Sequence, residues 1–121
     1  CPTKAISEPF VVDSRKCLAY HTIENRAPKL PDKIKNSLGS WVAGCDICQD
    51  ICPWNKKKLI SSTDKDIIPK EWVLRLTKQQ ALSWNDQEWN EKLKGSALKR
   101  IKPWMWRRNA SAATTNETQQ K

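Results

Sequence analysis

The chain has 121 residues, with 22 lysines and arginines against 13 acidic residues, and its formal net charge is +9. A mean hydropathy of −0.75 and an apolar content of 38% are lean for a self-sufficient core, so we expect a bound metal cluster to add cross-links. No apolar run reaches the roughly 20 residues of a membrane-spanning helix. The charge favours an anionic partner such as nucleic acid, although a basic surface without any partner fits it equally well.

The N-terminal residues predict a short antiparallel hairpin followed by a helix. Apolar pairs at 5–6 and 11–12 flank a polar, proline-containing turn, which is typical of a hairpin. Asp13 can then N-cap a helix that runs to about Glu24. One face of this helix would carry Cys17, Tyr20, His21 and Glu24.

Further short helices are marked by capping residues. Residues 32–38 predict one that ends at Gly39. A capping-box pattern begins a helix at about 77–82, and residues 85–88 fit the start of another that runs to about residue 94. Ser96 can cap a third short helix, and Pro103 can be the first residue of a fourth.

Two stretches predict little regular structure. The polar residues 56–70 read as a surface connection between a cysteine-rich part, 1–55, and a basic helical segment, 71–110. Residues 111–121 hold almost no apolar bulk, so we expect a disordered tail there.

The cysteine spacing is the strongest signal in the chain. Cys45, Cys48 and Cys52 read C-x2-C-x3-C-P, the closing part of the ferredoxin-type pattern for iron–sulfur clusters. The opening Cys1-Pro2 looks like the last cysteine of another such run. We therefore expect that further sequence precedes residue 1.

A crossover rule divides these cysteines between two clusters. In two-cluster ferredoxins, the cysteine before the proline ligates the other cluster. This rule places Cys1, Cys45 and Cys48 on one [4Fe–4S] cluster, and we expect Cys17, displaced along the sequence, to be its fourth ligand. The rule assigns Cys52 to a second cluster, whose remaining ligands would lie upstream.

Two other interpretations of the cysteines stay open. Zinc could be bound by Cys17, Cys45, Cys48 and either Cys1 or His21, although zinc sites usually pair two C-x2-C steps. Inert buried thiols are disfavoured, because three cysteines within eight residues fill a core poorly. Thiolate ligation rather than disulfide pairing indicates a reducing, cytoplasmic compartment.

Several longer motifs resemble those of the epoxyqueuosine reductase family. They are Asp13-x-Arg15-x-Cys17, the run from Gly44 to Asn55, the run from Gly95 to Arg100, and the run from Arg107 to Ala110. The resemblance covers about residues 1–110. It implies an α+β fold, mostly helical, in which a small ferredoxin-type dicluster core with a short β-hairpin precedes a basic helical segment.

The resemblance also implies an activity. Members of that family reduce epoxyqueuosine to queuosine in a tRNA anticodon loop, with a cobalamin in an N-terminal domain and two [4Fe–4S] clusters that deliver electrons to it. It implies a cytoplasmic, monomeric oxidoreductase supplied by a donor such as flavodoxin or ferredoxin. The cobalamin domain lies outside this chain, so no catalytic residue is expected within it.

Two rival functions remain: a stand-alone ferredoxin-like electron carrier, and a zinc-stapled RNA-binding module. The basic stretch 92–108 discriminates against a simple carrier, because it predicts a tRNA-binding face. Its candidate contacts are Lys99, Arg100, Lys102, Arg107 and Arg108. The alternative is that these charges only solvate a surface, while Trp104 and Trp106 belong to the core.

Other residues near the cysteines have mainly structural interpretations. His21 could donate toward a cluster sulfur, but a structural histidine is favoured. Glu24 and Asp46 fit caps or ion-pair partners. Trp41 and Trp54 flank the cysteine run and are expected to shield a cluster from water.

Overall fold

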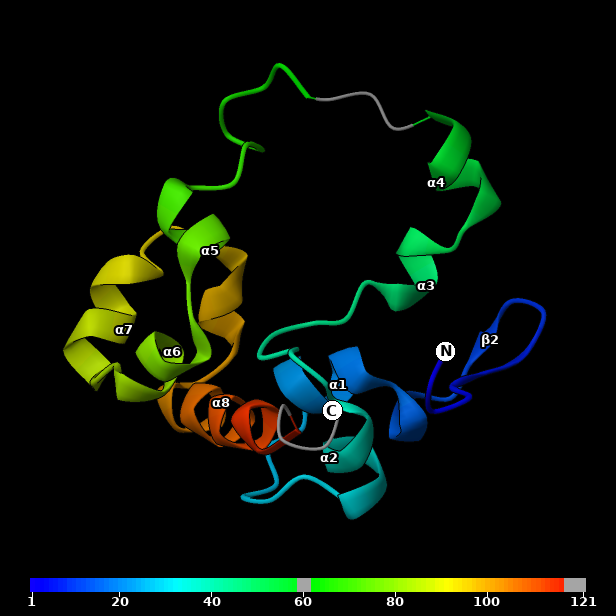
Figure 1. The fold of residues 1–121 in the computed structure, drawn as a ribbon, viewed down its shortest axis with the longest axis horizontal. Coiled ribbons are helices and arrows are strands. Elements are labelled where there is room, and N and C mark those ends of the chain that lie inside the picture. Colours follow the sequence, from blue (N-terminus) through cyan, green and yellow to red (C-terminus); the bar gives the residue numbers. More distant parts are fainter. Residues whose placement is uncertain (59–61, 117–121) are drawn as a thin grey trace.

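The computed structural model describes residues 1–58 and 62–116, with side chains for 1–56 and 62–113. The described part is mostly helical with one two-stranded antiparallel hairpin, which confirms the predicted fold class (Figure 1). The strands are β1 (Ile6–Glu8) and β2 (Val11–Val12), and the 3-10 helices are η1 (Ser14–Lys16) and η2 (Ala97–Arg100). The α-helices are α1 (Leu18–Ile23), α2 (Asp32–Ser37), α3 (Ile47–Asp50), α4 (Pro53–Lys58), α5 (Glu71–Arg75), α6 (Lys78–Ser83), α7 (Asp86–Lys92) and α8 (Pro103–Asn116).

The hairpin forms where the sequence predicts it. Ile6 pairs with Val12, and the turn is closed by Phe10 in a left-handed conformation with φ of 65°. The backbone N–H of Asp13 donates to the carbonyl of Ala5 at 2.8 Å, which joins the base of the hairpin to the next element.

The single helix predicted from Asp13 to Glu24 is wrong, because the chain breaks at Cys17. Asp13 does cap a helix, but that helix is the 3-10 turn η1, and Cys17 then takes an extended backbone with ψ of 122°. The carbonyl of Arg15 lies 2.8 Å from the ring Nε2 of His21, so it is not used for a helical hydrogen bond. Cys17 thus becomes the residue immediately before α1.

The capping box predicted at Thr77 is confirmed, and the helix start predicted at Asn85 also forms a capping box. In α6 and α7 the N-cap residues Thr77 and Asn85 exchange hydrogen bonds with Gln80 and Glu88, at 2.9 to 3.2 Å. Pro103 begins α8, also as predicted. Ser96 caps the 3-10 helix η2 rather than an α-helix.

The disordered tail predicted for 111–121 is wrong over 111–116, because α8 continues to Asn116. Ala112 and Ala113 are buried against the cluster formed by Leu18, Leu30, Ile34 and Leu38. Their small side chains let α1 and α2 approach α8, so helix packing compensates for the lack of apolar bulk. Residues 117–121 lie outside the described part.

A second apolar cluster fills the space between α6, α7 and α8. Trp84 and Trp106 stack with ring centroids 5.3 Å apart, and the Trp106 Nε1–H donates to the Ala81 carbonyl at 2.9 Å. The cluster also buries Trp89, Leu93, Ile101, Met105 and Ala110. Helix α8 therefore contacts both halves of the chain, as Figure 1 shows.

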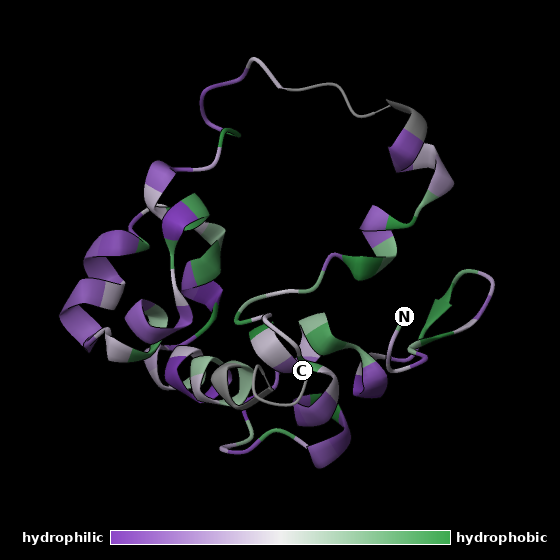
Figure 2. Ribbon diagram, in the orientation of Figure 1, coloured by the Kyte–Doolittle hydropathy of each residue, from purple (hydrophilic) through white to green (hydrophobic). Residues whose placement is uncertain are grey.

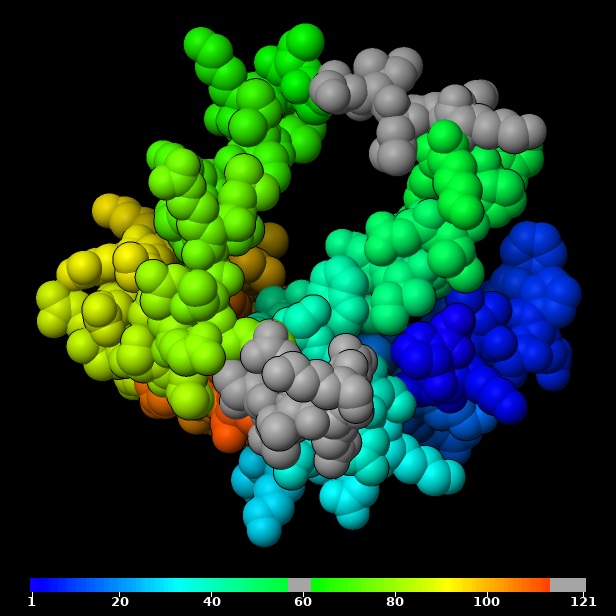
Figure 3. Space-filling model, viewed as in Figure 1, coloured from blue at the N-terminus to red at the C-terminus, as the bar shows by residue number. Residues whose placement is uncertain are grey.

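The connection predicted at 56–70 is partly regular. Residues 56–58 belong to α4, which was not predicted, whereas the described residues 62–70 are exposed and irregular. Figure 3 shows α3 and α4 extending away from the body of the molecule. In Figure 2 hydrophilic residues dominate α7, while β2 is apolar. Within the described ranges, no helix combines the length and apolarity needed to cross a bilayer.

Candidate metal centre

Four of the five cysteines line one small pocket of about 70 Å³. The four are Cys1, Cys17, Cys45 and Cys48, and they come from the N-terminal turn, the η1–α1 junction, the approach to α3, and α3 itself. The rest of the lining is Pro2, Ala5, Ile6, Val12, Leu18 and Ile47. The structure thus brings together the four residues that are expected to hold one cluster.

Cys52 is not among the residues that line this pocket. It lies between α3 and α4, where its carbonyl accepts the N–H groups of Asn55 and Lys56 at 3.1 Å. Pro53 occupies the first position of α4, which suits its fixed φ and missing N–H. This separation is the arrangement expected of a cysteine that ligates a different cluster.

The turn around Cys1 directs a backbone N–H at its sulfur. The N–H of Ala5 donates to the Cys1 Sγ at 3.2 Å, and the Thr3 hydroxyl lies 3.4 Å from the same sulfur. Lys4, with φ of 55°, provides the left-handed residue that this turn needs. Hydrogen bonds to a ligating sulfur stabilise its thiolate and tune the potential of a cluster.

Burial raises the pKa of the Cys45 thiol, and the neighbouring thiols of Cys48 and Cys17 raise it further. A hydrogen bond from the Ile47 N–H opposes this rise. Without a metal, Cys45 therefore favours the neutral thiol. A bound cationic centre would reverse that preference, because metals bind thiolates.

The donor set fits a cluster better than a single ion. Zinc requires its ligands within about 2.0–2.3 Å of one point. The described residues hold no group of three or more His, Cys, Asp or Glu placed to bind one metal ion. Four thiols around a shared pocket instead suit a larger body that presents one iron to each thiolate.

His21 has the structural role that was favoured. Its ring is buried, with Nε2 facing the Arg15 carbonyl at 2.8 Å and Nδ1 facing the Asn25 amide at 2.9 Å. Since a carbonyl only accepts, Nε2 carries the proton and Nδ1 accepts from Asn25. Both ring nitrogens are thus occupied, which leaves none for zinc or for a cluster sulfur.

The remaining predicted neighbours of the site differ in their surroundings. Glu24 pairs with Arg100, as an ion-pair partner should, whereas Asp46 precedes α3 without a side-chain capping bond. Trp41 is partly buried against the same apolar cluster as Cys45. Trp54 is 75% exposed, so within this chain it shields nothing.

Three of the five predicted RNA contacts, one of them the exposed Arg100, have partners within the chain. Arg100 pairs with Glu24, and Arg107 donates to Asp86 at 2.6 Å. Arg108 is half-buried, and burial lowers the pKa of its guanidinium. These partners lie 21 or more residues away in the sequence, which is why sequence patterns could not reveal them.

The two lysines and the two tryptophans of the basic stretch differ in their exposure to solvent. Lys99 and Lys102 are exposed, with the Lys99 Nζ 5.7 Å from the Trp89 ring centroid. Trp106 is a core residue, as the alternative interpretation held, while Trp104 is 40% exposed.

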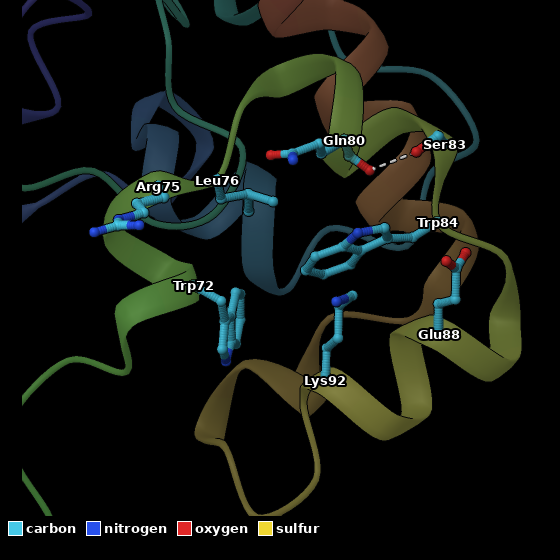
Figure 4. A pocket seen from close by; sticks show the side chains of 8 residues that line it. All are labelled: Trp72, Arg75, Leu76, Gln80, Ser83, Trp84, Glu88 and Lys92. Carbon is cyan, nitrogen blue, oxygen red and sulfur yellow. Dashed lines mark hydrogen bonds between the residues drawn. The ribbon is translucent and has the colours of Figure 1, made fainter.

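A second pocket, of about 360 Å³, lies between α5, α6 and α7 (Figure 4). It is lined by Trp72, Arg75, Leu76, Gln80, Ser83, Trp84, Glu88 and Lys92. Its polar groups already have local partners. Lys92 covers the Trp84 ring at 5.5 Å, and Glu88 completes the capping box of α7. Sequence analysis missed this pocket, because it forms only where three short helices meet.

Comparison with known proteins agrees with this geometry. Residues 1–55 match a family described as the 4Fe-4S double cluster binding domain, which agrees with the grouping of the cysteines. An epoxyqueuosine reductase from Prochlorococcus marinus is 66% identical over 109 residues, which are 90% of this chain and 35% of that protein.

Solved structures give the same result. Epoxyqueuosine reductase from Bacillus subtilis matches with a TM-score of 0.79 and 25% identity, over 96% of this chain and 30% of that one. An epoxyqueuosine reductase crystallised with an epoxyqueuosine-modified tRNA-Tyr stem loop matches with a TM-score of 0.78, 24% identity and the same coverage. The chain is thus similar to part of the epoxyqueuosine reductases, and it spans about a third of the length of the curated relatives it matches.

Proposed function

We propose that this chain is the cluster-bearing part of an epoxyqueuosine reductase, in which it passes electrons toward the reduction of epoxyqueuosine to queuosine in tRNA. The observation that carries the proposal is the convergence of Cys1, Cys17, Cys45 and Cys48 on one pocket that Cys52 does not line. A protein of this family needs such a division, because its two clusters share one chain.

The chain's own residues would hold, shield and tune a cluster. When bound, a [4Fe–4S] cluster supplies a one-electron carrier. Ile6, Val12 and Leu18 contribute apolar side chains to the lining beside the sulfurs, and the N–H groups of Ala5 and Ile47 donate to two of the sulfurs.

The other parts of the proposed system lie outside the chain. The cobalamin that acts on the epoxide would be bound by a separate N-terminal domain, and a flavodoxin or ferredoxin would supply electrons. We propose a cytoplasmic monomer whose substrate is tRNA. The net charge of +9 supports a polyanionic partner.

For tRNA contacts, the exposed Lys99 and Lys102 are the strongest candidates of the predicted set, since the three arginines have internal partners. Replacing both lysines by alanine in the complete protein should weaken tRNA binding. Each lost phosphate contact should lower the salt dependence of binding by about 0.7 to 0.9 units. Unchanged affinity and salt dependence would remove these lysines from the interface.

The test of the proposed function is an analysis of iron, acid-labile sulfide and zinc in the complete protein that contains these residues, prepared without oxygen. We expect about eight irons and matching sulfide. Cys17→Ser and Cys52→Ser should each remove about four irons, from different clusters with distinct electron paramagnetic resonance signals. Asp46→Ser, which changes an exposed residue beside Cys45, should remove none.

Two outcomes would contradict the proposal. About one zinc without sulfide, persisting after iron reconstitution, would leave a zinc-stapled RNA-binding module. Two intact clusters without turnover of epoxyqueuosine-tRNA, when cobalamin and a reductant are supplied, would leave a ferredoxin-like electron carrier.

A further inference from the structure

Two segments carry cysteines to the pocket, and the hydroxyl of one threonine joins them. Cys17 immediately precedes α1, and Gly44 immediately precedes Cys45. The buried hydroxyl of Thr22, in α1, donates to the Leu18 carbonyl at 3.0 Å and accepts the Gly44 N–H at 3.0 Å. This contact fixes the backbone before Cys45 relative to the helix after Cys17.

Asn109, from the distant helix α8, joins the same two segments at a second point. Its Nδ2 group donates to the carbonyl of Thr22 at 2.8 Å and to the carbonyl of Val42 at 2.9 Å. Asn109 is fully buried. One side chain thus spans from α1 to the residues that lead into Cys45.

Arg108 fixes the orientation of that amide. Its Nε and Nη2 donate to the Oδ1 of Asn109 at 3.1 and 2.9 Å. With carbonyls on one side of the amide and guanidinium N–H groups on the other, only one orientation satisfies every bond. Asn109 therefore uses two donors and accepts two bonds, so rotation would leave buried polar groups unpaired.

The same arginine supports the end of α1. Its Nη2 also donates to the His21 carbonyl at 2.9 Å, and its Nη1 donates to the Asn25 carbonyl at 2.9 Å and to the Ala27 carbonyl. The last carbonyls of a helix have no partner within it. Arg108 and Asn109 together supply those partners for His21 and Thr22, which a lysine could not do with the same fork geometry.

We propose that Asn109, oriented by Arg108, is a positioning residue for the cluster bound by Cys17 and Cys45. It touches neither sulfur and acts through the backbone of α1 and of residues 42–44. The inference rests on the proposed function, because it requires a cluster in this pocket. The inference assigns to α8 a role in cluster assembly, separate from any contact with tRNA.

The test compares Asn109→Ala with Asn90→Ala, which removes an exposed asparagine from α7, in the complete protein prepared without oxygen. We expect Asn109→Ala to accelerate chelator-driven iron release from one cluster by about 10-fold or more and to change its electron paramagnetic resonance signal. The cluster that contains Cys52 should keep its release rate and its signal. Asn90→Ala should match the wild type in both measurements.

Variants at Thr22 keep the inference testable if Asn109→Ala does not fold. Thr22→Val removes the acceptor for the Gly44 N–H at nearly constant volume, whereas Thr22→Ser keeps it. Faster iron release in Thr22→Val, restored in Thr22→Ser, would support the positioning role. Equal release and identical spectra in both would overturn it.

The outcomes separate this inference from the proposed function. Two clusters in the wild type, with unchanged release and spectra in folded Asn109→Ala, would overturn the inference alone. Zinc without sulfide in the wild type would overturn the proposed function and the inference with it.

Discussion

The segments that carry the cysteines and the helices that surround them are built differently. Residues 1–17 and 45–56 bury a single side chain, that of Ala5, whereas the other described segments bury all the remaining core residues. The cysteine segments also expose large apolar side chains, namely Ile6, Phe10, Val11, Val12, Ile51 and Trp54. The helices have an apolar core of their own, and the cysteine segments do not.

The two regions therefore obtain their stability from different sources. Burial of side chains such as Leu93 and Met105 stabilises the helices, since each fully buried apolar residue contributes about 1.5–3 kcal/mol. Within the described part of the chain, the cysteine segments lack such a core, and a bound group would supply comparable stabilisation. In small structural zinc sites, such binding contributes on the order of 10 kcal/mol.

Iron removal should have the largest effect, because it should remove amide protection from the cysteine segments and leave it in the helices. When a chelator strips iron from the complete protein, we expect backbone amides in the cysteine segments, such as that of Gln49, to exchange nearly as fast as in a free peptide. Amides in α8, such as that of Trp106, should keep most of their protection. Equal loss of protection in both places would show that the regions form one cooperative unit and would break the comparison.

Truncation of a core side chain should lower the stability of the helices. Leu93→Ala removes a fully buried side chain and should lower the free energy of unfolding by about 2–5 kcal/mol. Urea denaturation followed by tryptophan fluorescence measures this, because Trp84 and Trp89 lie in the same cluster. Leu74→Ala, at a position that is 73% exposed, should change stability by less than about 0.5 kcal/mol. Loss of iron from Leu93→Ala at unchanged stability would contradict the conclusion that Leu93 stabilises the helices.

The smallest expected effect is a dependence on pH at the junction before Cys17. The hydrogen bond from Arg15 lowers the pKa of Asp13 from its ordinary 3.8 to about 2. Because the folded pKa is the lower one, the ionised carboxylate stabilises the folded state above about pH 4, and this contribution is lost as the pH falls toward 2.

A carboxyl titration by nuclear magnetic resonance measures this pKa directly. Arg15→Ala should return the pKa of Asp13 toward 3.8, whereas Lys29→Ala, which removes an exposed cation elsewhere, should leave it near 2. An unchanged value in Arg15→Ala would show that another group holds the carboxylate.

Local chemistry made much of the fold predictable. The capping boxes of Thr77 and Asn85, the first-position Pro103 and the hairpin all depend on residues within a few positions of one another. The grouping of three of the four cysteines around one pocket followed from a spacing rule with a clear chemical basis.

What the sequence could not reveal depends on distant partners. Arg108 looked like a surface charge, but its carbonyl partners on His21, Asn25 and Ala27 lie more than 80 residues away. The end of α8 looked disordered because alanines lack bulk, although close packing against α2 is what small side chains allow. The break at Cys17 coincides with a contact between the His21 ring and the Arg15 carbonyl, six residues apart in the sequence.

The position of Asn109 has a consequence for biosynthesis. A ribosome that adds about 5–20 residues each second needs roughly 3–13 s to travel from Cys45 to Asn109. During that interval these cysteines have been translated, while the side chain that joins α1 to Val42 has not. Productive delivery of iron and sulfide should therefore follow translation of α8 rather than accompany translation of the cysteines.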